Sequence, residues 1–157
     1  MATLGHVHSA FTARASHLVL SMLATLPYCC ENCADRSSFV TQTFYSSIGW
    51  ATPAALGSEL AIVDGAKLGQ IDHKRTILIT GDGSFASTMQ EVGTMVKNNL
   101  APIIFIINND GYTVERVIHG ARQPYNDINK LDFAQILHVF SHPDPHASHH
   151  RCTTPTD

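Results

Sequence analysis

Two apolar runs in this chain each end in a polar, glycine-containing loop. Arg-Thr-Ile-Leu-Ile-Thr at 75–80 leads into Gly81-Asp82-Gly83-Ser84, and Ile-Ile-Phe-Ile-Ile at 103–107 leads into Asn108-Asn109-Asp110-Gly111. Both runs have the length and β-branched content of buried strands, and the second is expected in the middle of a sheet covered on both faces. Apolar residues at helical spacing lie between them, up to about Asn98. The pattern predicts a right-handed strand–helix–strand unit with two parallel strands.

The loops after the two strands are predicted to meet. Parallel strands deliver their following loops to the same carboxyl edge of a sheet, where open α/β sheets bind ligands. Asp82 and Asn109 are 27 residues apart in the sequence but should be neighbours in space. Asp82 offers a carboxylate, Asn109 an amide oxygen and Gly111 a main-chain carbonyl, all of which Mg²⁺ accepts as ligands. The sequence therefore predicts a divalent-cation site at this edge.

An anion would fit beside that cation. Gly83 and Ser84 lie where the second helix begins, so their N–H groups and the helix dipole favour a diphosphate. The same glycine-rich segments also occur as ordinary turns after strands, and the residue types alone leave both interpretations open. Glu115 follows Gly111 by four residues. It is a candidate general acid or base near a cofactor, or else a solvated carboxylate on a helix.

The remaining elements are predicted from periodicity and caps. One helix should begin with Thr52 as N-cap and Pro53 as first residue, and end near Ala66. Its buried stripe is expected to be Leu56, Leu60 and Val63. A capping box, Thr88 with Glu91, is expected in the helix between the two strands. Weaker helical patterns cover 17–26, 112–118 and 132–140, and the proline-containing tail from about 141 is expected to be irregular.

Two parts of the chain are expected to differ. Residues 1–38 show no pattern that we can assign and are interpreted as a disordered or non-native leader, in preference to a targeting peptide, because Arg14 is the only basic residue among the first 30 except histidines. Cys30 and Cys33 form a CxxC pair without the second pair that a zinc site needs. Residues 39–157 are predicted to form one domain.

Composition excludes some classes of function. The formal net charge is -3 over 157 residues, so no basic field favours nucleic acid. No apolar run approaches the ~20 residues of a membrane span. His142 and His146 are four residues apart, but intervening prolines break any helix that would align them as metal ligands. We expect a cytoplasmic protein that binds neither nucleic acid nor membrane.

The motifs together resemble a known family. Gly81-Asp82-Gly83-Ser84 through Asn108-Asn109 has the form of the thiamine-diphosphate-binding motif, and the residues from Asn108 to Glu115, Asn-Asn-Asp-Gly-Tyr-Thr-Val-Glu, are more specific, as are Ile118-His119-Gly120 and Tyr125-Asn126-Asp127-Ile128. From about Thr41 the chain resembles the C-terminal, diphosphate-binding domain of pyruvate decarboxylase, most closely the fungal enzymes, and the likeness fades after Phe140. It implies an α/β fold, a parallel sheet flanked by helices, incomplete because the domain's first strand is missing or replaced.

The resemblance also implies cofactors and roles. Thiamine diphosphate and Mg²⁺ would be the cofactors, and a 2-oxo acid such as pyruvate would be the substrate. Glu115 matches the family's catalytic carboxylate beside the substrate. Ile48 matches the apolar residue that holds the cofactor bent, and Ser46 replaces a usual glycine whose carbonyl contacts the aminopyrimidine. The implied metal ligands are Asp82, Asn109 and the Gly111 carbonyl, and the implied diphosphate contacts are Gly81, Gly83 and Ser84.

The family's subunits are several-fold longer than this chain. Their N-terminal domain supplies a glutamate that activates the aminopyrimidine, and no such domain is present in these 157 residues. The resemblance therefore implies the cofactor-binding part of an enzyme that converts pyruvate to acetaldehyde and CO₂. The alternative is an inactive module that binds cofactor or a full-length subunit. Either interpretation calls for a homo-oligomer or for a pyrimidine-binding domain from elsewhere.

Overall fold

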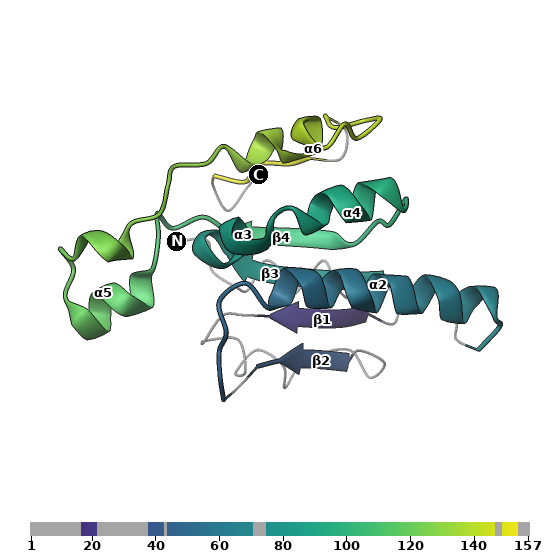
Figure 1. The fold of residues 1–157 in the computed structure, drawn as a ribbon, viewed down its shortest axis with the longest axis horizontal. Coiled ribbons are helices and arrows are strands. Elements are labelled where there is room, and N and C mark those ends of the chain that lie inside the picture. The colour runs from purple at the N-terminus through teal and green to yellow at the C-terminus, as the bar shows by residue number, and fades with distance from the viewer. Residues whose placement is uncertain (1–16, 22–37, 43, 71–74, 147–148, 154–157) are drawn as a thin grey trace.

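The fold is a four-stranded parallel sheet with helices packed on it, seen in a computed structural model that describes residues 17–21, 38–42, 44–70, 75–146 and 149–153 (Figure 1). The strand order is β2-β1-β3-β4, and each neighbouring pair is parallel. The strands are β1 (His17–Ser21), β2 (Ser38–Thr41), β3 (Arg75–Gly81) and β4 (Ile103–Ile107). The predicted α/β class with a parallel sheet is confirmed.

The helices divide into those that lie along the strands and those beyond the strand ends. Helix α2 (Ala51–Lys67) lies across β3 and β1, with α3 (Asp82–Thr88) and α4 (Glu91–Lys97) beside it (Figure 1). Helix α5 (Thr113–His119) and the 3₁₀ turn η2 (Pro124–Asn126) extend past the carboxyl ends of the strands. The 3₁₀ turn η3 (Phe133–Gln135) and α6 (Ile136–Val139) then return along α4.

The core is centred on β3, whose residues 76–80 are all buried. Leu78 packs against Ala51, Ala55 and Met95 on the helix side of the sheet. Ile77 and Ile79 face the other way, against Phe39 and Ile103. Burial of each such aliphatic side chain contributes about 1.5–3 kcal/mol. This two-sided burial fixes β3, and therefore the position of the loop that follows it.

The predicted strand–helix–strand unit is confirmed, with one correction for the second strand and one for the helix. β3 and β4 are parallel neighbours, paired from Ile77 with Ile103 to Gly81 with Ile107. β4 is the last strand of the four instead of a central one, and Phe105 and Ile107 are each 37% exposed. Within the described residues no strand follows β4 that could pair with its outer edge. The apolar run is therefore only partly buried.

The helix between these strands is interrupted. It divides into α3 and α4 at Met89–Gln90, and the expected capping box is wrong. The Thr88 hydroxyl donates instead to the Gly49 carbonyl, at 2.9 Å. Since this acceptor lies 39 residues upstream, a tertiary hydrogen bond has replaced the local one that the sequence pattern favoured.

Helix α2 also differs in detail from its prediction. The N-cap position is Trp50, and Thr52 is fully buried within the first turn. The buried positions lie one residue earlier than the predicted stripe of Leu56, Leu60 and Val63, and they include Ala55, Glu59 and Ile62. The small alanines let the helix approach β3 closely, and Glu59 Oε2 accepts the N–H of Thr76 at 3.1 Å. Sheet contact, not side-chain size, thus selects the buried face.

The predicted helix over 17–26 is wrong in its first half, because residues 17–21 form β1. This strand pairs with β2 on one side and β3 on the other. That the domain's first strand is missing or replaced stays a prediction. Two ladders of backbone hydrogen bonds outweigh a weak helical spacing. Residues 22–26, the Cys30–Cys33 pair and residues 1–16 lie outside the described residues. The patterns at 112–118 and 132–140 correspond to α5 and to η3 with α6.

Candidate functional site

Asp82 is the centre of the candidate site. It is the first residue of α3, directly after β3, and only 2% of it is exposed. Its Oδ1 accepts the N–H of Gly83 at 2.8 Å, while Oδ2 accepts the N–H groups of Asn109 at 3.2 Å and Gly111 at 2.9 Å. The predicted meeting of the two loops is confirmed. Three backbone donors hold the buried carboxylate without any cationic side chain.

The Asn109 side chain completes a group of three oxygen-bearing residues, Asp82, Asn109 and Gly111, which we call the Asp82 cluster. One end of its amide lies 3.1 Å from Asp82 Oδ1 and 3.1 Å from the Gly111 carbonyl oxygen, and the other lies 2.8 Å from Thr113 Oγ1. With nitrogen at the first end, the amide donates to both oxygens. In the opposite orientation of the amide, its oxygen lies at that end, so three oxygens face the same point. Neighbouring ligands of octahedral Mg²⁺ at 2.0–2.1 Å lie ~2.9 Å apart, so the spacing fits one cation.

Glycine is required at position 111. Its φ is +108°, and a Cβ there would lie 2.5 Å from the carbonyl oxygen of Asn126. The preceding Asp110 is also left-handed, with φ +62°. The Gly111 carbonyl accepts the N–H of Thr113 at 3.0 Å, which leaves one lone pair for a cation. The tight backbone is therefore what turns this carbonyl toward Asp82.

Two residues outside the predicted set support this loop. Asn126 is fully buried, accepts the N–H of Tyr112 at 3.0 Å, and donates through Nδ2 to the Gly120 carbonyl at 3.1 Å. Arg116 donates to the Asp110 carbonyl at 2.6 Å and to Asp127 Oδ1 at 2.9 Å. Sequence reasoning assigned neither residue a role. The available signal was the motif Tyr125 to Ile128, which carries one of them.

Gly83 and Ser84 lie in the first turn of α3 as predicted, and the Gly83 N–H and the Ser84 hydroxyl already have partners. The N–H of Gly83 donates to Asp82, and a Cβ at Gly83 would collide with the Tyr112 ring. Ser84 Oγ accepts the N–H of Gly49 at 3.0 Å. Together with the Thr88 bond to the Gly49 carbonyl, it fixes both backbone groups of Gly49 to α3. Gly81, the remaining predicted diphosphate residue, ends β3 in extended conformation.

This Gly49 connection joins the loop that carries Ser46 and Ile48 to the Asp82 region. Ser46 has φ +45° and its N–H donates to the Gln42 carbonyl at 3.2 Å. A left-handed backbone costs a non-glycine residue about 1–2 kcal/mol, which fits a position where glycine is usual. Ile48 is 52% exposed. The structure therefore brings the two halves of the predicted cofactor site onto one helix, while leaving the Ile48 side chain open to solvent.

Glu115 is placed differently from the other predicted site residues. It lies on α5, which buries none of its residues, and its Oε2 is 3.3 Å from Nε2 of His119. Its side chain is 41% exposed. The structure thus puts it on the unit that follows Gly111 without contact to the Asp82 cluster. Neither of its two interpretations is selected by this geometry.

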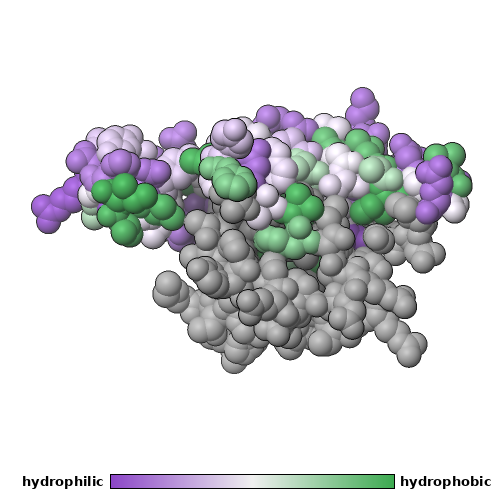
Figure 2. All heavy atoms as spheres, turned by 90° about the horizontal axis from the view of Figure 1, so that it is seen from below, coloured by the Kyte–Doolittle hydropathy of each residue, from purple (hydrophilic) through white to green (hydrophobic). Residues whose placement is uncertain are grey.

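An apolar surface surrounds this part of the molecule. On α5, Val114, Val117 and Ile118 are 56%, 81% and 63% exposed, and Tyr125 in η2 is 61% exposed. Figure 2 shows hydrophobic atoms gathered on the lobe that extends to the left. On the loop before Ile48, Phe44 is 96% exposed. An exposed apolar patch with polar residues at its rim is typical of a surface that another protein covers.

Two negative findings concern only the described part of the chain. None of its helices is long and apolar enough to cross a bilayer. Nor do its His, Cys, Asp and Glu side chains gather in threes as they would around a metal ion, and the tail histidines are included in that finding. The cation site proposed around Asp82 relies instead on one carboxylate with amide and main-chain oxygens.

Comparison with known proteins gives one matching family model and a similar solved structure. The family model described as thiamine pyrophosphate enzyme, C-terminal TPP binding domain, matches residues 26–149. The match begins earlier than Thr41, so it includes residues to which we assigned no resemblance. In structure, the chain is similar to a Rhodococcus jostii thiamine diphosphate-dependent 4-hydroxybenzoylformate decarboxylase, with a TM-score of 0.65 at 19% identity. That alignment covers 86% of this chain and 25% of the other.

Curated relatives are considerably longer. A Schizosaccharomyces pombe protein named "Putative pyruvate decarboxylase" is 44% identical over 119 residues, which is 75% of this chain and 20% of the relative. An "Alpha-keto-acid decarboxylase" from Mycobacterium avium is 47% identical over 91 residues, 58% of this chain and 15% of the relative. The chain therefore spans about a fifth or less of the length of these proteins.

Proposed function

This chain belongs to the family of C-terminal TPP-binding domains of thiamine pyrophosphate enzymes, and from that premise we propose that it forms the Mg²⁺- and diphosphate-binding half of a pyruvate decarboxylase active site. The observation that carries the proposal is the convergence of Asp82, Asn109 and Gly111. The Asn109 amide lies 3.1 Å from Asp82 Oδ1 and 3.1 Å from the Gly111 carbonyl oxygen. These distances are close to the ~2.9 Å between neighbouring oxygens around an octahedral Mg²⁺.

In this proposal each part of the Asp82 carboxylate has its own task. Oδ2 is held by the backbone of the second loop, through Asn109 and Gly111. Oδ1 faces the Asn109 amide and is the oxygen that would bind the cation. The carboxylate thus connects the two loops through backbone hydrogen bonds. Mg²⁺ held there would neutralise the diphosphate, next to the start of α3 at Gly83 and Ser84.

Thiamine diphosphate, when bound, would supply a carbanion that adds to the keto carbon of a 2-oxo acid and an electron sink for loss of CO₂. The chain's residues would hold and orient it. Ile48 would support its bent conformation, and the Ser46 carbonyl would meet its aminopyrimidine. The hydrogen bonds of Gly49 to Ser84 and Thr88 would fix the distance between the loop of Ser46 and Ile48 and the diphosphate-binding start of α3.

Glu115 is proposed as the carboxylate that moves a proton near the substrate in the assembled enzyme. Its present partner is His119, at 3.3 Å and at the surface. A general acid or base works best when burial and neighbours tune it to the working pH. We therefore propose that Glu115 becomes functional only when another protein surface covers α5.

The substrate and the cellular location are part of the same proposal. Relatives that match this chain are named as pyruvate and alpha-keto-acid decarboxylases. We propose pyruvate as substrate, acetaldehyde and CO₂ as products, and the cytoplasm as location. The chain covers only about a fifth of the relatives' length. We propose that a pyrimidine-binding domain, in a partner subunit or elsewhere in a homo-oligomer, completes the site for this reaction.

A second candidate function is supported by the exposed apolar residues of α5 and the Ile48 loop. A catalytically inactive module with this surface would associate with a full-length subunit of the same family. The candidates differ in activity: the first predicts turnover when the pyrimidine-binding domain is added, and the second predicts none and a loss of activity in the full-length partner.

Calorimetry with the purified chain tests the proposal. Thiamine diphosphate should bind when Mg²⁺ is present and should not bind in EDTA, and Asp82→Ala should abolish binding while Asp64→Ala, at an exposed position on α2, should leave it intact. Binding that ignores EDTA would contradict the metal assignment. Acetaldehyde formation from pyruvate by the chain alone would contradict its role as half of a site.

A further inference from the structure

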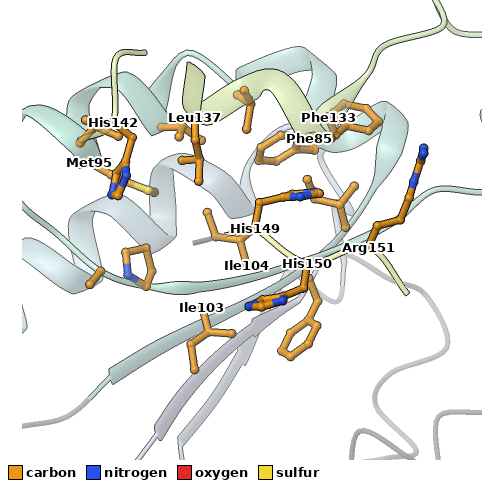
Figure 3. Close-up of a pocket in the computed structure, with 18 of the residues that line it drawn as sticks. Phe85, Met95, Ile103, Ile104, Phe133, Leu137, His142, His149, His150 and Arg151 are labelled. Carbon is orange, nitrogen blue, oxygen red and sulfur yellow. The ribbon is translucent and has the colours of Figure 1, made fainter. Parts of the chain in front are cut away.

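One cavity in the described part of the chain lies away from the Asp82 cluster. It has a volume of about 980 Å³ and lies between β4, α4, η3 with α6, and the tail segment 149–153 (Figure 3). Of the two loops that meet at Asp82, only Asn108 contributes to its lining. Its size is at the upper end of the range of about 300–1,000 Å³ in which proteins bind small molecules.

The inner walls of this cavity are apolar. Phe85 and Phe133 meet edge to face, with ring centroids 5.6 Å apart, and form one end together. Leu137 of α6 and Met95 of α4 face Ile104 of β4 across the space (Figure 3). Ile104 is only partly buried and lines the cavity from the sheet side. The walls therefore suit a hydrocarbon chain.

The polar lining carries positive and neutral groups and no acidic one. Two arginines, Arg75 and Arg151, contribute to it together with His142, His149 and His150, whereas none of the described lining residues is Asp or Glu. The chain as a whole has a net charge of -3, so the lining of this cavity has the opposite sign of charge to the whole chain. His142 Nδ1 accepts the N–H of Asp144 at 3.1 Å, which leaves Nε2 as the donor of a neutral ring.

His149 shows how the two kinds of lining meet. In Figure 3 its ring lies between the helix layer, with Phe133 and Leu137, and the strand that carries Ile104. Arg151 follows two residues later and is exposed at the edge of the cavity. A ligand with an apolar body and an anionic head would place the body between these layers and the head at the imidazole and guanidinium groups.

We propose that this cavity is a binding site for an amphipathic anion, of the class of medium-chain aliphatic carboxylates. The apolar walls account for affinity, and the positive lining accounts for the preference for an anion. This site is independent of the cofactor proposal, because Asp82, Asn109 and Gly111 do not line it.

The test uses the purified full-length chain and three probes in calorimetry. Dodecanoate below its micellar concentration should bind. Dodecanol, with the same chain and no charge, should bind about tenfold more weakly, since a charge-assisted contact contributes roughly 1.5 kcal/mol. Butyrate, with the charge and little chain, should not bind measurably. Equal binding of dodecanol and dodecanoate, or no binding of dodecanoate, would overturn the proposal.

Paired variants locate the site. Leu137→Glu, which puts a carboxylate on the wall, should abolish dodecanoate binding, whereas Val139→Glu on the same helix, 71% exposed and outside the lining, should not. Arg151→Ala should weaken binding about fivefold while the exposed Arg122→Ala leaves it unchanged. Arg151 is exposed, so its variant stays informative if Leu137→Glu fails to fold. Displacement of dodecanoate by thiamine diphosphate with Mg²⁺, or equal effects within each pair, would contradict the assignment.

Discussion

The Asp82 cluster and the α5 lobe lie next to each other in the chain but are built in opposite ways. At Asp82 a buried carboxylate has three backbone donors, and a glycine that no other residue can replace holds the loop. On α5 no residue is buried, and apolar side chains up to 81% exposed surround Glu115. Under the proposed function, this chain would supply the metal end of the site, and a second protein surface would complete the substrate end. Four changes test this difference.

The largest effect is expected from Asp82→Ala. It removes the acceptor of three N–H groups, two in buried hydrogen bonds and that of Asn109 in a part-buried one. At about 1–3 kcal/mol for each buried group left unsatisfied, we expect a loss of roughly 3–5 kcal/mol in the free energy of unfolding. Urea denaturation followed by circular dichroism measures it. Asp64→Ala, at a residue whose side chain is 68% exposed, is the control and should change stability little. A loss below ~1 kcal/mol would show that the cluster does not stabilise the fold.

Gly111→Ala should come next. A Cβ at φ +108° would meet the Asn126 carbonyl, so we expect a loss of about 2–3 kcal/mol and weaker Mg²⁺-dependent cofactor binding. Gly57→Ala, in the exposed middle of α2 with open space around its Cβ, is the matched control. It should stabilise by about 0.5–1 kcal/mol. Equal effects of the two alanines on unfolding would contradict the requirement for glycine at 111.

Thr88→Ala tests the connection between the two halves of the cofactor site. It removes the hydrogen bond to the Gly49 carbonyl, which should cost about 1 kcal/mol of stability and release the Ile48 loop from α3. Cofactor affinity should fall several-fold in calorimetry, with the Mg²⁺ requirement retained. Thr94→Ala, at an exposed site on α4, serves as control. If affinity is unchanged, the Ile48 loop does not take part in binding by this chain.

Glu115→Gln should have the smallest effect. An exposed pair with His119 contributes less than ~0.5 kcal/mol, so unfolding and cofactor binding by the isolated chain should stay the same. With a pyrimidine-binding domain supplied, the same variant should lose most pyruvate turnover while its cofactor affinity is retained. Full turnover of the variant in that assembly would remove Glu115 from the catalytic group and leave it a solvated helix residue.

Several local expectations failed because a distant partner replaced a local one. Thr88 was expected to cap its own helix but bonds to Gly49. Thr52 is a different case: it was expected at the N-cap but is buried in the first turn, and its hydroxyl has no hydrogen-bond partner among the described residues. The 17–26 pattern was helical in spacing, yet its first five residues form β1 between two other strands. Asn126 and Arg116, which hold the Gly111 loop, follow no pattern of spacing that sequence reasoning uses.

The sequence by itself determined the β3–α–β4 unit and the meeting of Asp82 with Asn109. Apolar runs of strand length, a helix between them and the handedness of the crossover leave one arrangement of the following loops, because parallel strands end at one edge. Only the tertiary structure decided the orientation of the Asp82 carboxylate, the Gly49 connection and the cavity beside β4. These depend on contacts between segments separated by 27 to 39 residues or more. Such contacts form only after the sheet has brought their partners together, and nothing in the neighbouring residues encodes them.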